Sequence, residues 1–244
     1  AIAQSCDVFF YDLAYKLGID NIHHSLSYFQ FGKETGIDLP GELSGILPSR
    51  EWKKINKNEP WYRGETLNIG IGQGFFNASP LQLAVATAAI ANKGKLLKPQ
   101  VLMRTQTKNG DTYEEDNNSA RQIPIKNINN WEIIIEGMKQ TIYGKLGTGR
   151  RLNLDLDYTL AGKTGTAQVF GLDPEEEYIA ENYEEKLRDH ALFTAFAPIE
   201  DPEVAIAIIV ENAGSGSSKA APIAKSLLDL YFSKKPSMLN SVTE

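Results

Sequence analysis

The sequence predicts an α+β fold in which an antiparallel sheet is flanked by helices and adjoined by a helical lobe. The first half of the chain combines helical spacing with long stretches punctuated by glycine and proline. The second half contains segments with strand character, and a short proline-bounded turn separates the last two. A helical pattern closes the chain. Strands that follow one another, rather than alternating with helices, favour an antiparallel sheet.

The length and composition are those of a folded domain. At 244 residues, with 42% hydrophobic and 23% charged residues, the chain can build a full core. We expect residues 1–233 to be folded and residues 234–244 to form a disordered tail. The chain opens as if within a helix, without a capping residue, so we expect a C-terminal fragment of a longer protein.

Charge, hydropathy and cysteine content exclude several classes of protein. The net charge is −6 and the basic residues form no stripe, which argues against a nucleic-acid partner. The longest strongly apolar run, residues 204–210, is too short to cross a bilayer, which needs about 20 residues. The single cysteine, Cys6, cannot form an internal disulfide, so cysteine content does not indicate the compartment.

The first expected helix lies within residues 1–30, where apolar residues recur at mixed helical spacing. Val8, Leu13, Leu17 and Ile22 fall on roughly one side, which we expect to face the core. The aromatic residues of this segment are also expected in the core: Phe9, Phe10, Tyr11 and Tyr15.

The second helix has the clearest boundaries. Ser79 is a good N-cap, Pro80 suits the first helical position and Gln82 completes a capping box. Gly94 is a natural stop for this helix. Its start and its end can therefore both be predicted from residue types alone.

Two more helices and four strands complete the expected elements. The helices occupy residues 131–143 and 220–232, where apolar residues form one face. Strand patterns cover residues 99–107, 159–169, 190–197 and 204–211. The turn at residues 198–202 joins the last two strands, so we expect a hairpin.

Two segments are expected to lack regular structure. Glycine and proline punctuate residues 32–64, and the tryptophans of this stretch indicate a packed loop. Residues 171–189 are strongly acidic. Such a run is usually solvated surface, and the alternative is a mobile flap near a functional site.

The most informative motif is Lys163, Thr164, Gly165 and Thr166, within an expected strand. A glycine in a strand often marks the close approach of a ligand or another backbone. A fixed positive charge, two hydroxyl groups and a bare backbone could hold a carboxylate and accept an acyl peptide as an added strand. The alternative is an ordinary edge strand with a solvated lysine. K-T-G is also one signature of penicillin-binding proteins and class A β-lactamases, together with S-x-x-K and S-D-N.

Ser5 and Asp7 form a second motif, S-x-D, which by itself is common. A serine hydroxyl can relay a proton to a leaving amine when a nearby lysine sets the local charge. The side chain two residues later can hold a substrate amide and anchor that lysine. Ser5 and Lys163 are far apart in the sequence, so only the fold can bring the two motifs together.

With both motifs, the chain resembles the transpeptidase domain of class B penicillin-binding proteins, and among them the elongation-type D,D-transpeptidases. Seven blocks in the same order carry the resemblance: residues 5–7, 35–42, 48–52, 60–66, 70–74, 163–170 and 190–198. It implies a penicillin-binding or serine β-lactamase-like fold, of which this chain is the C-terminal part. No serine here has a lysine three positions later, so the acylated serine is expected upstream of Ala1. The chain alone is therefore expected to be inactive.

The resemblance implies roles for the site residues. Ser5 matches the serine of S-x-N, and Asp7 stands where asparagine is commoner. Because an ionised carboxylate cannot donate a hydrogen bond, Asp7 suits pairing with the lysine better than holding a substrate amide. Lys163 would anchor the terminal carboxylate of the substrate, and the Thr166 N–H would be an oxyanion-hole donor. The residues expected to contact substrate are Thr164, Gly165 and Thr166.

The implied reaction is acyl transfer through a serine ester. A stem peptide ending in D-Ala-D-Ala would lose its last residue, and the amine of a second stem would then form the cross-link. β-Lactams would mimic the donor and stall as acyl-enzymes. The alternatives are hydrolysis, as in a D,D-carboxypeptidase or a β-lactamase, and a penicillin-sensing domain without turnover. The resemblance also implies a location on the periplasmic side of the bacterial inner membrane, an anchoring helix outside this chain and a membrane glycosyltransferase as partner.

No cofactor is expected for catalysis, although two patterns leave alternatives open. Gly70, Gly72 and Gly74 resemble a dinucleotide-binding loop, but the third glycine is one residue early and the capped helix begins only at Ser79. Backbone packing beside the site is the favoured interpretation. Cys6 lies between two site residues, and some elongation-type relatives hold zinc near this position. A structural zinc ion at Cys6 is therefore an alternative to an inert thiol.

Overall fold

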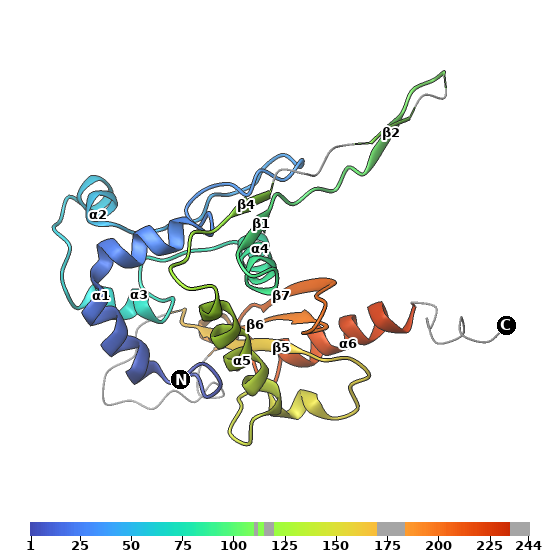
Figure 1. Ribbon diagram of the computed structural model, residues 1–244. Helices are drawn as coiled ribbons and strands as arrows, with labels where there is room; N and C mark the ends of the chain where they lie inside the picture. Colours follow the sequence, from blue (N-terminus) through green and yellow to red (C-terminus); the bar gives the residue numbers. More distant parts are fainter. Residues whose placement is uncertain (110–111, 115–119, 170–183, 235–244) are drawn as a thin grey trace.

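The computed structural model describes residues 1–109, 112–114, 120–169 and 184–234, and it has the expected α+β architecture (Figure 1). The predicted tail beyond Lys234 and residues 171–183 of the acidic segment lie outside the described residues. In chain order the elements are α1 (Asp7–Ser27), α2 (Arg50–Lys57), α3 (Glu65–Gly70), α4 (Pro80–Ala91), β1 (Lys95–Leu97), β2 (Arg104–Gln106), β3 (Thr112–Glu114), β4 (Ala120–Gln122), α5 (Asn129–Tyr143), η1 (Arg150–Asn153), β5 (Ala161–Ala167), η3 (Glu185–Leu187), β6 (His190–Ala197), β7 (Val204–Val210) and α6 (Ala220–Ser233).

The main sheet has the order β5-β6-β7 and is antiparallel throughout. Lys163 of β5 stands opposite Thr194 of β6, and Thr166 stands opposite Ala191. The predicted hairpin is confirmed as β6 and β7. Because β6 occupies the middle, one edge of β5 remains free of strand pairing among the described residues.

Helices cover both faces of this sheet (Figure 1). Phe193 is buried on one face in a cluster with Leu228 of α6. Phe196 is buried on the opposite face with Ala91 of α4 and Met138 of α5. Successive residues of a strand point to opposite faces, so β6 supplies both cores from alternate positions. These two apolar layers hold β5 and its free edge in place.

The predicted start of α4 is confirmed by a complete capping box. The Ser79 hydroxyl accepts from the Gln82 N–H at 3.1 Å, and the Gln82 Oε1 accepts from the Ser79 N–H at 2.9 Å. The Gln82 side-chain amide donates to the carbonyls of Lys33 and Ser44, both at 2.8 Å. One buried glutamine therefore caps the helix and also anchors the preceding loop.

The predicted buried side of α1 is wrong except at Ile22. Val8 is 76% exposed and Phe9 is 51% exposed. The helix instead turns Ala14 toward α3, where Gly70 permits a close approach: a Cβ added at Gly70 would lie 2.4 Å from the Ala14 Cβ. The buried residues of α1 are Ala14, Ile19 and Ile22. The other exposed residues of the predicted core are Leu13, Tyr15 and Leu17.

Residues 32–64 contain helix α2, although the glycines and prolines of this stretch predicted an irregular loop. The Ser49 hydroxyl caps α2 by accepting from the Trp52 N–H at 3.0 Å. Lys53 of α2 is only 1% exposed and forms an ion pair with Glu65 at the start of α3. This pair ties α2 to α3, the helix that leads into the loop beside β5.

The strand predicted at residues 99–107 is correct only for β2. That strand pairs with β3 in a narrow arm that projects from the body, and β1 pairs with β4 at its base (Figure 1). Asp38 accepts from the backbone N–H groups of Val101 and Leu102 at 2.7 and 2.6 Å. The segment before β2 is thus held by a side chain rather than by strand pairing.

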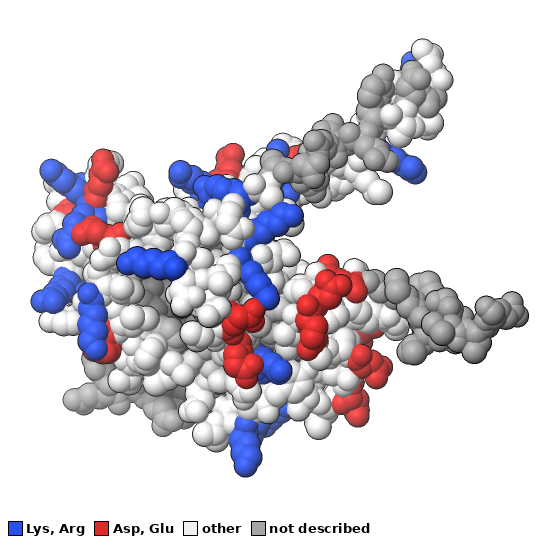
Figure 2. Space-filling model, in the orientation of Figure 1, with Lys and Arg blue, Asp and Glu red and all other residues white. Residues whose placement is uncertain are grey.

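The surface carries charges of both signs. On the face in Figure 2, Lys and Arg lie interspersed with Asp and Glu. Within the described residues, no helix is both long enough and apolar enough to pass through a membrane.

Candidate active site

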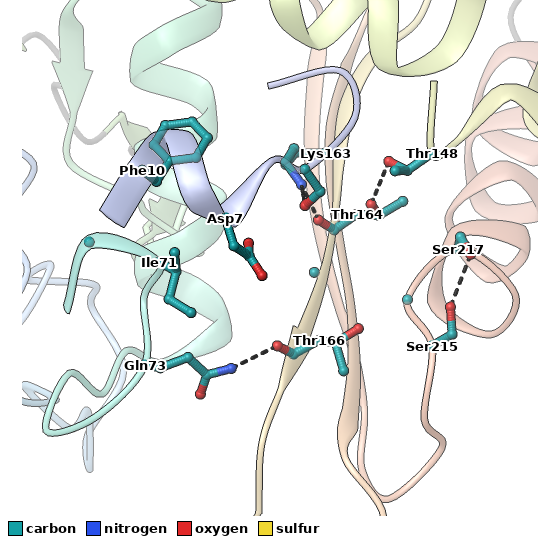
Figure 3. Close-up of a pocket in the computed structure, with 14 residues that line it drawn as sticks. Asp7, Phe10, Ile71, Gln73, Thr148, Lys163, Thr164, Thr166, Ser215 and Ser217 are labelled. Atoms are coloured by element: carbon teal, nitrogen blue, oxygen red, sulfur yellow. Dashed lines mark hydrogen bonds between the residues drawn. The ribbon is translucent and has the colours of Figure 1, made fainter. Parts of the chain in front are cut away.

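A pocket of about 570 Å³ opens along the free edge of β5 (Figure 3). Its walls come from the start of α1, the loop that follows α3, strand β5 and the turn before α6. The fold thus brings together segments from both ends of the chain. The predicted catalytic residues all line this pocket: Ser5, Asp7, Lys163 and Thr166.

The central contact of the pocket joins the two sequence motifs. The Lys163 ammonium donates to the Ser5 hydroxyl, with Nζ and Oγ 2.6 Å apart. It also donates to the Thr164 carbonyl at 2.6 Å. The serine is therefore hydrogen-bonded to a cation, the arrangement needed to pass a proton between a reacting group and solvent or a leaving group.

The residues before Ser5 fix its position. The Ala3 carbonyl accepts from the Thr148 N–H at 3.1 Å. Ile2 packs on α5 at Gly137, where an added Cβ would lie 3.0 Å from the Ile2 Cδ1. Ser5 itself has a φ of 53°, in the left-handed region that few non-glycine residues adopt. This turn directs the chain from the α5 surface into α1 and leaves the Ser5 hydroxyl facing β5.

The charge of Lys163 is set by two opposing effects. Burial lowers the pKa of Lys163 below its usual value, and the negative charge of Asp7 acts in the opposite direction. Asp7 extends from the first turn of α1 into the pocket (Figure 3). Asp7 therefore stabilises the ammonium form of a lysine whose surroundings favour loss of the proton.

The two threonines of the β5 motif differ in their surroundings. The Thr164 side chain is 8% exposed, and its hydroxyl lies 2.7 Å from the hydroxyl of Thr148. Thr166 is exposed to the pocket. Sequence reasoning did not identify Thr148, which stands in the glycine-rich connector at residues 144–151. The connector thus places the Thr148 hydroxyl at the pocket wall, beside that of Thr164.

A further missed residue, Gln73, lies on the free edge of β5. Its side-chain amide donates to the Thr166 carbonyl at 3.0 Å, and its Oε1 accepts from the Gln168 N–H at 3.4 Å. Gln73 belongs to the glycine block at residues 70–74, and Gly70 in that block packs directly on Ala14. The block thus packs beside the site, as predicted, and it also places the Gln73 carboxamide in the pocket.

The opposite wall is the turn at residues 214–218. A Cβ added at Gly216 would lie 2.2 Å from the carbonyl oxygens of Gly165 and Leu192. Only glycine permits this close approach to the sheet. The hydroxyls of Ser215 and Ser217, 3.0 Å apart, flank it at the pocket (Figure 3). No role at the site was predicted for this turn, although G-S-G-S-S next to a helix is rich in potential hydrogen-bond donors.

Cys6 is a free, exposed thiol. In the part of the chain that the structure describes, no three or more His, Cys, Asp or Glu side chains are grouped so that they could hold a metal ion. A structural zinc site usually requires four ligands. The residues around Cys6 thus do not by themselves fit a zinc ion, and zinc binding here remains a prediction.

Known proteins match both the sequence and the structure of this chain. Residues 1–229 match the penicillin binding protein transpeptidase domain family. The peptidoglycan D,D-transpeptidase MrdA of Haemophilus influenzae is 40% identical over 235 residues, which cover 96% of this chain and 36% of that protein. The chain thus spans about a third of the length of this relative.

Two solved structures extend the comparison to the fold. The structure of Pseudomonas aeruginosa PBP2 in complex with WCK 5153 has a TM-score of 0.81 and 40% identity, covering 95% of this chain and 46% of that one. The complex of PBP2 and MreC from Helicobacter pylori has a TM-score of 0.80 and 33% identity, covering 96% of this chain and 40% of that one. These similarities agree with the elongation-type, PBP2-like resemblance predicted from the sequence. The chain belongs to the transpeptidase domain family of the penicillin-binding proteins.

Proposed function

We propose that this chain is part of a D,D-transpeptidase that cross-links peptidoglycan stem peptides through a serine acyl-enzyme. The observation that carries the proposal is the 2.6 Å contact between Lys163 and Ser5 at the free edge of β5. A penicillin-binding transpeptidase needs a strand edge for the acyl donor and a proton relay beside it. The identity to D,D-transpeptidases over almost the whole chain supports the same activity.

The donor peptide would bind as an additional strand beside β5. Its terminal carboxylate would lie near the ammonium of Lys163 and the exposed hydroxyl of Thr166. The Thr166 N–H would donate to the oxygen of the scissile carbonyl as negative charge develops there, a contact whose loss typically costs about 10²–10³ in rate. Thr164, whose hydroxyl is bonded to Thr148, would stabilise the strand behind this contact.

The reaction would proceed in two steps that share one proton relay. We propose that the acylated serine lies in an S-x-x-K motif of the full-length protein, outside the 244 residues of this chain. In the first step its oxygen would form an ester to the penultimate D-Ala, and the C–N bond to the terminal D-Ala would break. The proton would reach the leaving amine through Ser5, which Lys163 orients. In the second step the amine of another stem would form a C–N bond to the ester carbonyl, the C–O bond to the serine would break, and the amine proton would pass through Ser5 to the serine oxygen.

The lowered pKa of Lys163 suits this relay. An ammonium that burial has made more acidic can share its proton with Ser5 at a smaller cost, while the negative charge of Asp7 raises the pKa of Lys163 and favours the ammonium form. The same lysine can therefore attract the donor carboxylate and assist proton transfer.

The wider setting is proposed from the relatives. The H. pylori relative was solved together with MreC, which supports a role for this protein in a cell-wall assembly complex. We place the full-length protein on the periplasmic side of the bacterial inner membrane, with an anchoring helix outside this chain and a membrane glycosyltransferase as partner. β-Lactams would be its inhibitors.

The test is a reaction of the full-length protein with a D-Ala-D-Ala donor and an acceptor amine, followed by mass spectrometry of the products. The proposal predicts a cross-linked peptide and release of D-Ala. D-Ala release without cross-linking would instead indicate a D,D-carboxypeptidase. Rapid turnover of benzylpenicillin would indicate a β-lactamase, and a stable penicillin adduct without any peptide product would indicate a sensing domain.

A further inference from the structure

The free edge of β5 is partly occupied by a side chain. The Gln73 Nε2 donates to the Thr166 carbonyl at 3.0 Å, and the Gln73 Oε1 accepts from the Gln168 N–H at 3.4 Å. One carboxamide thus satisfies a carbonyl and an N–H two residues further along, as the N–H and C=O of one residue in a neighbouring parallel strand would do. Gln73 imitates a short piece of paired strand (Figure 3).

This contact involves the residue across which a donor peptide would pair. Each strand residue presents its N–H and its C=O to the same side of the sheet. Since the Thr166 carbonyl reaches Gln73 and not β6, the Thr166 N–H also faces the free edge. A peptide added at this edge would use both groups, and Gln73 already holds the carbonyl.

The contact is built so that it can be released. The Gln73 residue is only half-buried, and its second hydrogen bond, at 3.4 Å, is long. The flanking Gly72 and Gly74 have φ angles of 77° and 72°, in a region where glycine turns without strain. Gly70, by contrast, is packed against Ala14. The Gln73 N–H donates to the Asn68 carbonyl at 2.9 Å, so the backbone of the loop is held and release of the strand requires only rotation of the Gln73 side chain.

We propose that Gln73 is a specificity-determining positioning residue whose carboxamide occupies the Thr166 carbonyl until the backbone amide of an acyl donor displaces it. This inference deepens the proposed function and rests on it. A donor with an amide N–H next to its reacting carbonyl must replace the Gln73 hydrogen bond. A donor without that N–H does not compete for the Thr166 carbonyl and leaves Gln73 in place.

The test compares two β-lactams on the full-length protein: benzylpenicillin, which has an acylamino N–H, and a carbapenem, which has a hydroxyethyl group instead. The readout is the ratio of their second-order acylation rate constants. Gln73→Ala should raise the benzylpenicillin-to-carbapenem ratio about fivefold, the value of one competing hydrogen bond. Gln73→Glu, which keeps the length but lacks the N–H donor, should raise the ratio as well. Gln140→Ala, on the exposed side of α5, is the matched control and should leave it unchanged.

The outcomes separate this inference from the proposed function. An unchanged or lowered ratio in both Gln73 variants, with wild-type protein that is acylated by both compounds, would overturn the role of Gln73 alone. Absence of acylation in the wild-type protein would instead overturn the proposed function. Because each variant is compared with itself across two compounds, a general loss of folding or activity cancels in the ratio.

Discussion

The Ser5 hydroxyl and the Lys163 ammonium lie 2.6 Å apart, although the two residues are 158 positions apart in the sequence. The contact depends on three packing arrangements: the Ile2 contact with α5, the hydrogen bond from Thr148 to Ala3, and the pairing of β5 with β6. None of the three involves Ser5 or Lys163 side chains. The two groups can therefore be altered individually while their surroundings remain intact.

Ser5→Ala in the full-length protein should slow acylation by benzylpenicillin by about 10²–10⁴, the usual contribution of a positioned proton-transfer group. The rate can be followed by loss of β-lactam absorbance. Ser226→Ala, on an exposed position of α6, is the control and should react like the wild type. An unchanged rate in Ser5→Ala would show that Ser5 takes no part in the relay.

Asp7→Asn should lower the pKa of Lys163 further, because Asp7 opposes the effect of burial. Heteronuclear NMR of the lysine side chains of this chain would give the pKa directly. Asp12→Asn, which removes a carboxylate that pairs with Lys16 elsewhere on α1, should leave it unchanged. A Lys163 pKa that stays constant or rises in Asp7→Asn would contradict the electrostatic role of Asp7.

The lowered pKa of Lys163 also affects how the stability of the chain depends on pH. The folded chain holds the Lys163 proton less tightly than the unfolded chain, so the contribution of Lys163 to the free energy of unfolding rises with pH between the lowered pKa and 10.5. Asp7→Asn should extend that rise to lower pH. Urea denaturation of this chain and of Asp7→Asn at several pH values measures the difference, with Asp12→Asn as the reference.

Thr148→Val should destabilise the chain by about 1–3 kcal/mol, because it leaves the buried Thr164 hydroxyl without its partner. The double variant with Thr164→Val should recover part of that loss. A double-mutant cycle by urea denaturation should give a coupling of about 0.5–1.5 kcal/mol. Strict additivity of the two substitutions would mean that the hydroxyl pair does not contribute.

Gly216→Ala should destabilise the chain by about 1–3 kcal/mol, as expected for overpacking against a rigid sheet. The added methyl would lie 2.2 Å from two carbonyl oxygens that cannot move without disturbing β5 or β6. Gly64→Ala is the control, since no atom lies within 4 Å of a Cβ at that position. Equal midpoints of thermal unfolding for the two variants would contradict the packing described for the turn before α6.

The sequence predicted elements best where the information is local. Ser79, Pro80 and Gln82 specify the start of α4 by hydrogen bonds within one turn, and the mostly apolar run at residues 191–197 specifies β6, a strand buried on both faces. Helix α2 was missed because the frequent glycines and prolines around it outweighed the capping signal of Ser49. The buried side of α1 was wrong because it depends on contacts with residues distant in sequence, such as that between Ala14 and Gly70.

The residues of the site also differ in whether they could be predicted from the sequence. Ser5, Asp7 and Lys163 could be named in advance because their residue types and spacing match a known chemistry, and the fold brings them to one pocket. Thr148, Gln73 and Gly216 could not, because each acts through a contact with a residue far away in the sequence. Glycine-flanked polar residues in connectors were the available signal, and they become informative only once the sheet edge they face is known.

Intact-protein mass spectrometry after incubation with benzylpenicillin tests the central claim most directly. The full-length protein should gain the mass of one benzylpenicillin, on a serine outside the 244 residues of this chain, and Lys163→Met should slow that reaction. The chain alone should gain no mass under the same conditions. An adduct on a residue of this chain, or a wild-type full-length protein that remains unmodified, would contradict the account.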